Sequence, residues 1–208
     1  MILTLGNTKG GTGKSTLSVQ FAIHRSRNHS VLLVDGDEQQ SAMDFTNLRS
    51  VEDYTAIRLT GSQIHRQVKL LVKNYDDVII DCGGRDTTGF RAALTITNLL
   101  LIPVQPRTFD IWAMESVMLL VAEARPFNPE IQCRALLNLA DTQCRDNESA
   151  RQQLSEYGIK VIEPIIQRRK VYSDSIGCGK GIAEMKPRNK KAIDELNAVI
   201  ESVYGESI

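Results

Sequence analysis

Residues 7–16 read NTKGGTGKST, and their position between two predicted elements decides the fold. The stretch follows a short apolar run at residues 2–5 and precedes a helical pattern at residues 14–27. Glycines let a loop turn its backbone N–H groups inward around an anion, and the start of the following helix adds a positive field. A strand, a glycine-rich loop and a helix in this order are typical of a phosphate-binding loop.

The loop carries the side chains that a nucleoside triphosphate and its metal need. Lys14 can reach the β- and γ-phosphates, the Ser15 hydroxyl suits Mg²⁺, and Thr16 can bind the α-phosphate. Thr8 stands where the common G-x-x-x-x-G-K-[ST] pattern has its first glycine, and Lys9 adds a second cation. The predicted phosphate contacts are Lys9, Gly10, Gly11, Thr12, Gly13, Lys14, Ser15 and Thr16.

Short apolar runs alternate with longer amphipathic ones along the rest of the chain. Runs that are apolar at every position are typical of strands in a parallel sheet with helices on both faces. The predicted strands are residues 2–5, 31–34, 78–80, 99–104, 135–139 and 161–166. The predicted helices are residues 14–27, 62–73, 88–97, 111–125, 147–157 and 189–204. We therefore predict one α/β domain over residues 1–208, with a mostly parallel sheet and no N-terminal helix-turn-helix extension.

Three aspartates lie at the ends of predicted strands. Asp35 and Asp37 follow the second strand, and Asp81 follows the third. Open parallel sheets bind ligands at the edge formed by these strand ends. A carboxylate in the position of Asp81 fits a water-mediated contact to Mg²⁺. Asp35 and Asp37 have an alternative interpretation, as residues that form a turn or cap the segment at 39–41.

Composition excludes several classes of protein. Lys and Arg number 25 and Asp and Glu number 25 among 208 residues, so the chain is neither a wholly basic DNA-coating protein nor an acidic disordered one. No apolar stretch approaches the ~18 residues that a membrane span needs. The four cysteines lack the spacing of a zinc or iron–sulfur site, which favours reduced thiols in a cytoplasmic protein.

Positive charge is concentrated toward the C-terminal end. Residues 160–191 contain nine basic and three acidic residues, an excess of six positive charges. Such a surface can bind phosphate backbones without reading their sequence, and a dimer would strengthen the binding. An ordinary solvated basic face is the alternative. The basic residues are Lys160, Arg168, Arg169, Lys170, Lys180, Lys186, Arg188, Lys190 and Lys191.

Several stretches together resemble the ParA/MinD family of deviant Walker A ATPases, and in particular its short plasmid-partition ParA members. The matching stretches are KGGTGKST at 9–16, VLLVDGDEQ at 31–39, VIID at 78–81, IPVQP at 102–106, DIWA at 110–113 and QRRKVY at 167–172. They span nearly the whole chain and imply a P-loop NTPase fold. The chain departs from the family at Glu38, where a D-x-D-P-Q pattern has proline, and at Gly83 and Gly84, which replace a proline-containing switch.

The resemblance implies catalytic and metal-binding roles. Lys9 would cross a dimer interface to phosphates bound by a partner subunit, and Asp37 would position or activate the attacking water. Two lysines in one short loop repel each other unless phosphates lie between them, which agrees with two sandwiched nucleotides. The implied catalytic residues are Lys9, Lys14 and Asp37, and the implied Mg²⁺ shell is Ser15, Asp35 and Asp81.

The base is expected to be adenine, because no Asn-Lys-x-Asp guanine reader occurs in the sequence. Asn138, Gln167 and Arg168 stand in the regions where relatives hold adenine. The expected cofactors are therefore ATP and Mg²⁺. One carboxylate and one lysine suggest a slow intrinsic ATPase that a partner accelerates.

The expected function is that of an ATP-dependent homodimer that binds DNA non-specifically. It would segregate a plasmid or chromosome together with a separate centromere-binding or adaptor protein, in the nucleoid region of the cytoplasm. One alternative is an ATPase that positions a protein cargo such as a microcompartment. Another is a metabolic P-loop ligase of the dethiobiotin-synthetase type, against which Lys9 and the basic segment argue.

A membrane-binding role like that of MinD would need an amphipathic C-terminal helix. Residues 189–204 do form such a pattern, but Asp194, Glu195 and Glu201 would be repelled by anionic lipid. We therefore expect this helix to pack on the core and no membrane partner.

Overall fold

The computed structural model describes residues 1–84, 88–106, 108–141 and 145–205, and leaves out the side chains of residues 108–112. Cys144 and most of the 110–113 stretch that carried part of the resemblance lie outside the described side chains. Among the other thiols, Cys82 is buried, Cys133 is half-buried and Cys178 is exposed, and all three are free.

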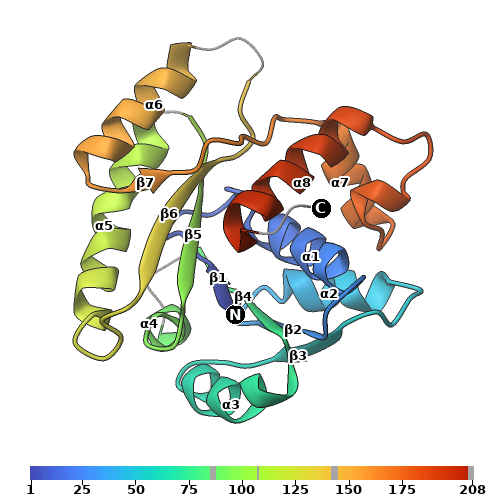
Figure 1. Cartoon of the computed structure of the whole chain (residues 1–208), viewed down its shortest axis with the longest axis horizontal. Coiled ribbons are helices and arrows are strands. Elements are labelled where there is room, and N and C mark those ends of the chain that lie inside the picture. Colours follow the sequence, from blue (N-terminus) through green and yellow to red (C-terminus); the bar gives the residue numbers. More distant parts are fainter. Residues whose placement is uncertain (85–87, 107, 142–144, 206–208) are drawn as a thin grey trace.

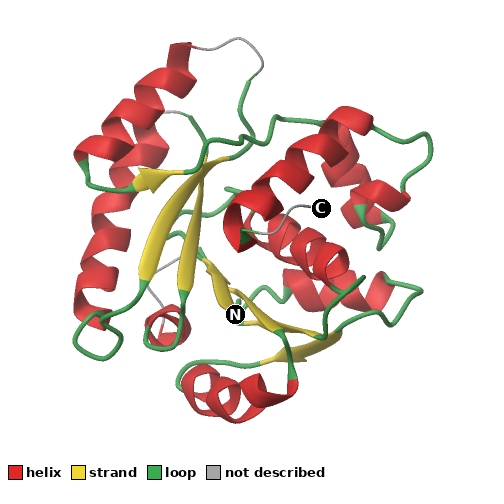
Figure 2. Ribbon diagram, in the orientation of Figure 1, coloured by secondary structure: helices red, strands yellow, loops and turns green. Residues whose placement is uncertain are grey.

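A sheet of seven strands forms the centre of the molecule, in the order β3-β2-β4-β1-β5-β6-β7 (Figure 2). Every pair of neighbouring strands is parallel, as the apolar runs predict. The strands are β1 (Ile2–Leu5), β2 (Val31–Asp35), β3 (Thr55–Arg58), β4 (Asp77–Asp81), β5 (Leu99–Val104), β6 (Gln132–Leu137) and β7 (Lys160–Val161).

Helices cover both faces of the sheet and enclose two separate apolar cores (Figure 1). One face carries α1 (Lys14–Arg25), α2 (Ser41–Leu48), α7 (Lys170–Gly177) and α8 (Lys190–Tyr204). The other face carries α3 (Gln63–Leu71), α4 (Thr88–Leu94), α5 (Thr108–Ala124) and α6 (Arg145–Glu156). The described residues also form the short 3₁₀ turns η1 (Val72–Asn74) and η2 (Ile182–Glu184). The predicted α/β class with helices on both faces is confirmed.

The C-terminal helix α8 packs on the core, as expected. Asn189 caps it by accepting a hydrogen bond from the N–H of Ala192 at 3.1 Å. Its buried face consists of Ala192, Leu196, Val199, Ile200 and Val203. Within the described ranges, no helix is both long and apolar enough to cross a bilayer.

Strand order and register bring distant residues to one edge of the sheet. Leu5 and Asp35 both pair with Asp81, so β1, β2 and β4 end at the same level. The chain leaves β1 toward one side of the sheet and β5 toward the other, and α1 and α5 cover opposite faces. Ligands of doubly wound sheets bind at the carboxyl edge beside such a reversal.

Candidate nucleotide-binding site

The loop between β1 and α1 has backbone angles that only certain residues accept. Gly11 and Gly13 lie in the left-handed region, at φ +75° and φ +89°. A Cβ atom at Gly13 would also clash with Nδ2 of Asn138. Glycine at position 13 is therefore required both by the turn and by a close neighbour.

The loop presents a run of unused backbone donors. Among the residues that the structure describes, the N–H groups of residues 10–16 have no hydrogen-bond acceptor. Three loop carbonyls are paired instead: Lys9 O with Lys14 Nζ at 2.9 Å, Gly11 O with Gln105 Nε2 at 2.9 Å, and Thr12 O with Asn138 Nδ2 at 2.7 Å. Free donors at the start of a helix suit an anion, and the phosphate contacts of these residues stay a prediction.

The Lys14 ammonium is buried in this site, with 6% of the residue exposed. Burial lowers its pKa, and the nearby carboxylates of Asp81 and Asp37 partly oppose the shift. A bound phosphate would give the ammonium a charged partner in place of the Lys9 carbonyl.

The loop lines a cavity of about 1290 Å³, which is large enough for a nucleotide. Its walls come from the β2–α2 and β3–α3 loops, the segment after β4 with the start of α4, the residues after β6, helix α7, and the first turns of α1. Among the predicted site residues, those that line it are Gly10, Gly11, Gly13, Lys14, Ser15, Thr16, Asp37, Asn138 and Arg168. The other predicted site residues, Lys9, Thr12, Asp35, Asp81 and Gln167, are not among the lining residues. Gln167 instead contacts Arg169 and Glu195.

Asp81 is fully buried at the end of β4, with both carboxylate oxygens lacking a hydrogen-bond partner among the described residues. Burial raises its pKa to about 7, while the nearby Ser15 hydroxyl and the Lys14 ammonium limit the rise. An orphaned buried carboxylate beside a hydroxyl fits a hard divalent cation. No group of three His, Cys, Asp or Glu side chains in the described ranges could hold a metal by itself. Phosphates and water would therefore have to complete the coordination of Mg²⁺.

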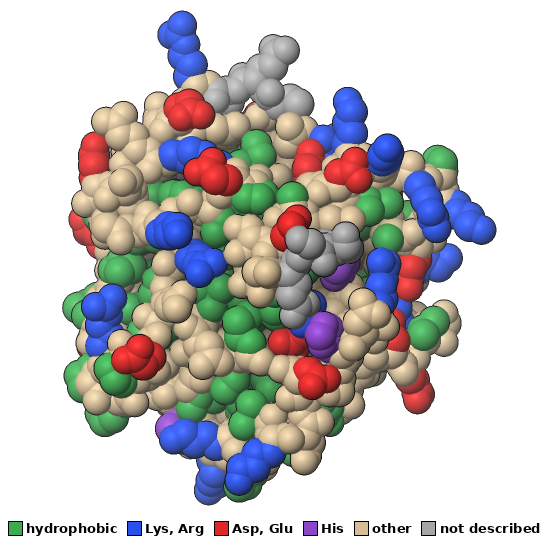
Figure 3. Space-filling view, in the orientation of Figure 1, with side chains coloured by type: hydrophobic (Ala, Val, Ile, Leu, Met, Phe, Trp, Pro, Cys, Tyr) green, Lys and Arg blue, Asp and Glu red, His purple; other side chains and the backbone are tan. Residues whose placement is uncertain are grey.

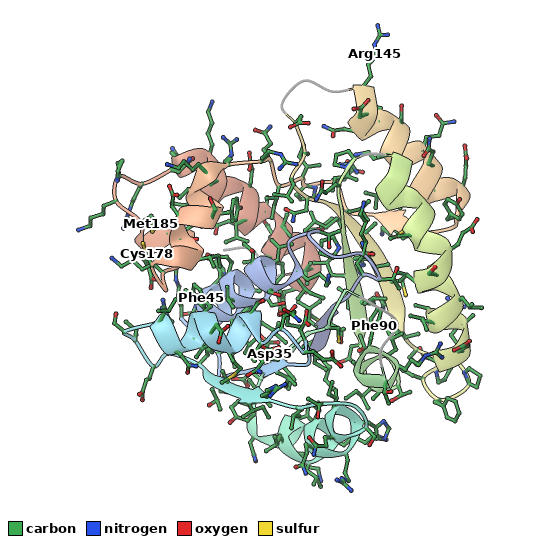
Figure 4. All side chains as sticks on the ribbon, turned by 180° about the vertical axis from the view of Figure 1, so that it is seen from behind. Asp35, Phe45, Phe90, Arg145, Cys178 and Met185 are labelled. Atoms are coloured by element: carbon green, nitrogen blue, oxygen red, sulfur yellow. The ribbon has the colours of Figure 1, made fainter. Side chains whose placement is uncertain are left out.

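Asp35 is engaged in shaping the backbone around the site. Its Oδ1 accepts from the N–H of Asp37 at 3.0 Å, and its Oδ2 accepts from the N–H of Met43 at 2.8 Å. Figure 4 shows Asp35 beneath helix α2, on the side of the sheet that carries Phe45. Burial raises the pKa of this carboxyl, and the two N–H donors partly offset the rise. The structure thus shows the turn-forming and capping role, and a contact with Mg²⁺ stays a prediction.

Two glycines after β4 pack closely against both sides of the phosphate site. A Cβ atom at Gly83 would lie 3.3 Å from Asp37 Oδ1, and one at Gly84 would lie 2.9 Å from the backbone nitrogen of Gly10. Asp37 itself accepts a hydrogen bond from the N–H of Gln39 at 3.0 Å and lines the cavity. A shift of residues 83–84 would therefore displace Asp37 or the backbone of the phosphate loop.

Sequence reasoning missed Gln105, which holds the loop from the end of β5. The sequence did carry a signal for this residue. Gln105 has a carboxamide and directly follows the apolar run at 99–104, which places it at the same sheet edge as the aspartates. Asn138 follows β6 in the same way, and its amide contacts the loop at Thr12. A contact of Asn138, Gln167 or Arg168 with adenine stays a prediction.

A comparison with known protein families decides the class of this site. Residues 3–206 match the profile described as CobQ/CobB/MinD/ParA nucleotide binding domain. The chain belongs to this family.

Relatives within the CobQ/CobB/MinD/ParA family match along almost their whole length. "Maintenance of carboxysome distribution protein A" of Halothiobacillus neapolitanus is 26% identical over 205 residues, covering 97% of this chain and 95% of the relative. "Protein ParA" of Rhizobium radiobacter is 26% identical over 212 residues, covering 98% and 96%.

Solved structures of the family share the fold. An aspartate-to-alanine variant of McdA from Cyanothece, in complex with ATP, has a TM-score of 0.83 at 16% identity and covers 100% of this chain and 97% of that chain. MinD from Pyrococcus horikoshii, in complex with Mg-ADP, has a TM-score of 0.77 at 17% identity, covering 98% and 95%. The predicted P-loop NTPase fold is confirmed.

Proposed function

We propose that this chain is a Mg-ATP-dependent ATPase that dimerises around its nucleotides, binds DNA without sequence preference, and segregates a plasmid or chromosome with a separate adaptor protein. One observation carries the proposal. Among the described residues, the loop combines two lysines with seven N–H groups that have no acceptor, beside the Asp81 carboxylate, which has no hydrogen-bond partner there. This set of groups suits a triphosphate with its metal.

The residues divide the work on ATP between them. The free N–H groups and Lys14 would hold the phosphates, and the Ser15 hydroxyl and Asp81 would hold Mg²⁺. When bound, Mg²⁺ neutralises charge on the β- and γ-phosphate oxygens. Asp37 lines the cavity, where it would orient a water toward the terminal phosphate.

Lys9 supports the dimeric form of the proposal. Its carbonyl already accepts from Lys14, and its N–H donates to Asn7 Oδ1 at 3.0 Å, so the backbone at this position is fixed. A lysine side chain on a fixed loop beside a phosphate site can reach a second nucleotide when another copy of the chain faces it. Two such lysines would then be separated by phosphate charge.

A basic groove at the α7–α8 side supports DNA binding. It has a volume of about 470 Å³ and is lined by Lys186, Arg188, Lys190 and Lys191, with Asp174 as its acid. These four cations are exposed, and none forms an ion pair with a described residue. Figure 3 shows Lys and Arg side chains projecting from the side of the molecule where α7 and α8 lie. Such a groove fits phosphate backbones.

The structure divides the basic segment differently from the sequence expectation. Arg169 is paired with Glu195 and only 19% of its side chain is exposed. Arg168 lines the nucleotide cavity, 3.9 Å from Asp141, and Lys170 lies 3.9 Å from Asp174. Arg169 is therefore neutralised by Glu195, whereas Arg168 and Lys170 only make loose, exposed contacts with acids. We place the DNA contact on the groove lined by residues 186–191, whose cations have no such contact among the described residues.

Reversing two charges in the groove is expected to weaken ATP-dependent DNA binding. A Lys190→Glu, Lys191→Glu variant should bind mixed-sequence duplex DNA at least tenfold more weakly, with a shallower salt dependence, because each phosphate contact adds about −0.9 to the log–log salt slope. MgATP affinity should stay within about twofold, because the groove is separate from the nucleotide cavity. Fluorescence anisotropy of labelled DNA at several salt concentrations measures the DNA affinity and its salt dependence.

The control is Lys69→Glu with Lys73→Glu, which makes the same charge change on exposed residues of α3 and η1. Equal loss of DNA binding in both variants would show only a net-charge effect. Full DNA binding by the groove variant would refute the assignment of the surface.

A protein cargo is the second candidate, favoured by the similarity to a protein named for carboxysome distribution. The ATPase cycle and DNA binding would be the same, and the adaptor would differ. Pull-down of the chain with MgATP should recover a centromere-binding protein in one case and an assembly-bound adaptor in the other.

A metabolic ligase is a further candidate, because the family profile names CobQ and CobB. Such an enzyme needs a small-molecule acceptor to turn over ATP. Phosphate release from MgATP alone, stimulated by DNA, would support the ATPase proposal. Strict dependence on a small-molecule acceptor would support the ligase.

A further inference from the structure

Two carboxamides hold the phosphate loop from one side of the sheet. Gln105 directly follows β5 and Asn138 directly follows β6, and the N–H of Asn138 donates to the carbonyl of Val104 at 2.8 Å. The carboxylates of Asp35 and Asp81 end β2 and β4, on the other side of β1. The loop therefore lies between an amide side and a carboxylate side.

The two amides act on neighbouring peptide groups. Gln105 donates to the carbonyl of Gly11 at 2.9 Å, and Asn138 donates to the carbonyl of Thr12 at 2.7 Å. In a planar trans peptide the carbonyl and the following N–H point in opposite directions. Holding these two carbonyls toward β5 and β6 therefore turns the N–H groups of Thr12 and Gly13 away from that side.

Without these two hydrogen bonds, few contacts would fix the orientation of these peptide planes. Gly11 and Gly13 tolerate several backbone conformations, and the N–H groups of residues 10–16 have no acceptor among the described residues. A preorganised set of donors binds an anion more tightly than one that must reorganise.

We propose that Gln105 is a positioning residue for nucleotide binding: it acts with Asn138 to orient the peptides of residues 11–13, so that their N–H groups are ready for the β-phosphate. The inference rests on the proposed function as an ATPase. Gln105 itself need not touch the nucleotide, because its amide is committed to Gly11.

Gln105 can be substituted with less disturbance of the core than Asn138. Asn138 is 3% exposed and packs directly against Gly13, so its replacement would disturb the core. Gln105 is half-buried and its hydrogen bond lies at the surface. Gln105→Met keeps the length and removes the donor, whereas Gln105→Glu keeps the shape and places an oxygen against the Gly11 carbonyl.

The experiment measures affinities for MgATP, MgADP and AMP in the full chain, together with the steady-state ATPase rate and thermal unfolding. Gln105→Met should weaken MgATP and MgADP equally, by about three- to tenfold, as loss of one hydrogen bond implies. Gln105→Glu should weaken both more. AMP, which has no β-phosphate, should bind as before, KM should rise, and kcat should stay within about twofold.

The matched control is Gln152→Met on α6, whose amide donates to Glu156 far along the chain from the loop. It should leave all affinities unchanged. Equal weakening of AMP, or a parallel fall in Tm and affinity, would indicate a merely structural role and overturn the inference. Unchanged MgADP affinity in both Gln105 variants would overturn it as well. A wild-type chain that binds no nucleotide would instead overturn the proposed function, and this inference with it.

Discussion

Replacing Lys14 with alanine is expected to weaken MgATP binding by at least about 100-fold without lowering the Tm of the ligand-free protein. The affinity falls because a charge-assisted contact to phosphate in a desolvated site is lost. The Tm is maintained because the buried ammonium costs desolvation energy, which its lowered pKa reflects. Within the described residues, the ammonium forms a hydrogen bond only to the Lys9 carbonyl, at 2.9 Å.

Isothermal titration calorimetry and differential scanning fluorimetry measure the two effects. Lys69→Ala, which removes an exposed lysine from α3, is the control and should change neither. If Lys14→Ala bound MgATP within tenfold of the wild type, the assignment of the phosphate site would be wrong.

Replacing Asp81 with asparagine is expected to stabilise the empty protein at pH 8 and to remove its response to Mg²⁺. The folded-state pKa of about 7 lies above the ordinary value of 3.8, so the folded protein holds a proton that the unfolded chain releases between these values. The stability of the wild type therefore falls as pH rises through that window. Asparagine carries no charge to desolvate, and the gain at pH 8 should be on the order of 1–3 kcal/mol.

The same substitution should also remove the Mg²⁺ site. In the wild type, MgATP should raise the Tm well above the value with ATP and EDTA, because binding to the folded state adds to stability. In Asp81→Asn the two values should agree within about 1–2 °C. Glu130→Gln removes an exposed carboxylate and is the control, expected to retain the wild-type profile. A variant that is less stable at pH 8 and still responds to Mg²⁺ would contradict the account of Asp81.

Buried elements of the fold could be predicted because burial on both faces leaves a continuous apolar run. The edge strand β3 (Thr55–Arg58) has exposed or half-buried residues throughout and carries no such signal. The strand predicted at 161–166 is reduced to Lys160–Val161, because Pro164 has no N–H to donate to a neighbouring strand. Helices α2 and α7 are eight residues each, too short for a clear helical period.

The phosphate site could be predicted where the chemistry is local. Residues 9–16 are consecutive, so the loop and its donors follow from the order of residues. Gln105 acts on Gly11 across 94 positions of sequence, and only the strand order shows that β5 lies beside β1. The sequence also could not show which basic residues are available to DNA. Arg169 and Glu195 form an ion pair only because α8 packs back onto the fold.

The central claim is that ATP joins two copies of this chain through Lys9, and the mass of the protein in solution tests it most directly. Light scattering of the Asp37→Ala variant, which should bind ATP without consuming it, should give twice the protomer mass of 23.2 kDa with MgATP and the protomer mass with MgADP. Adding Lys9→Gln to that variant should restore the protomer mass while MgATP still binds. A protomer mass with ATP bound in the Asp37→Ala variant, or a dimer that Lys9→Gln leaves intact, would contradict the account.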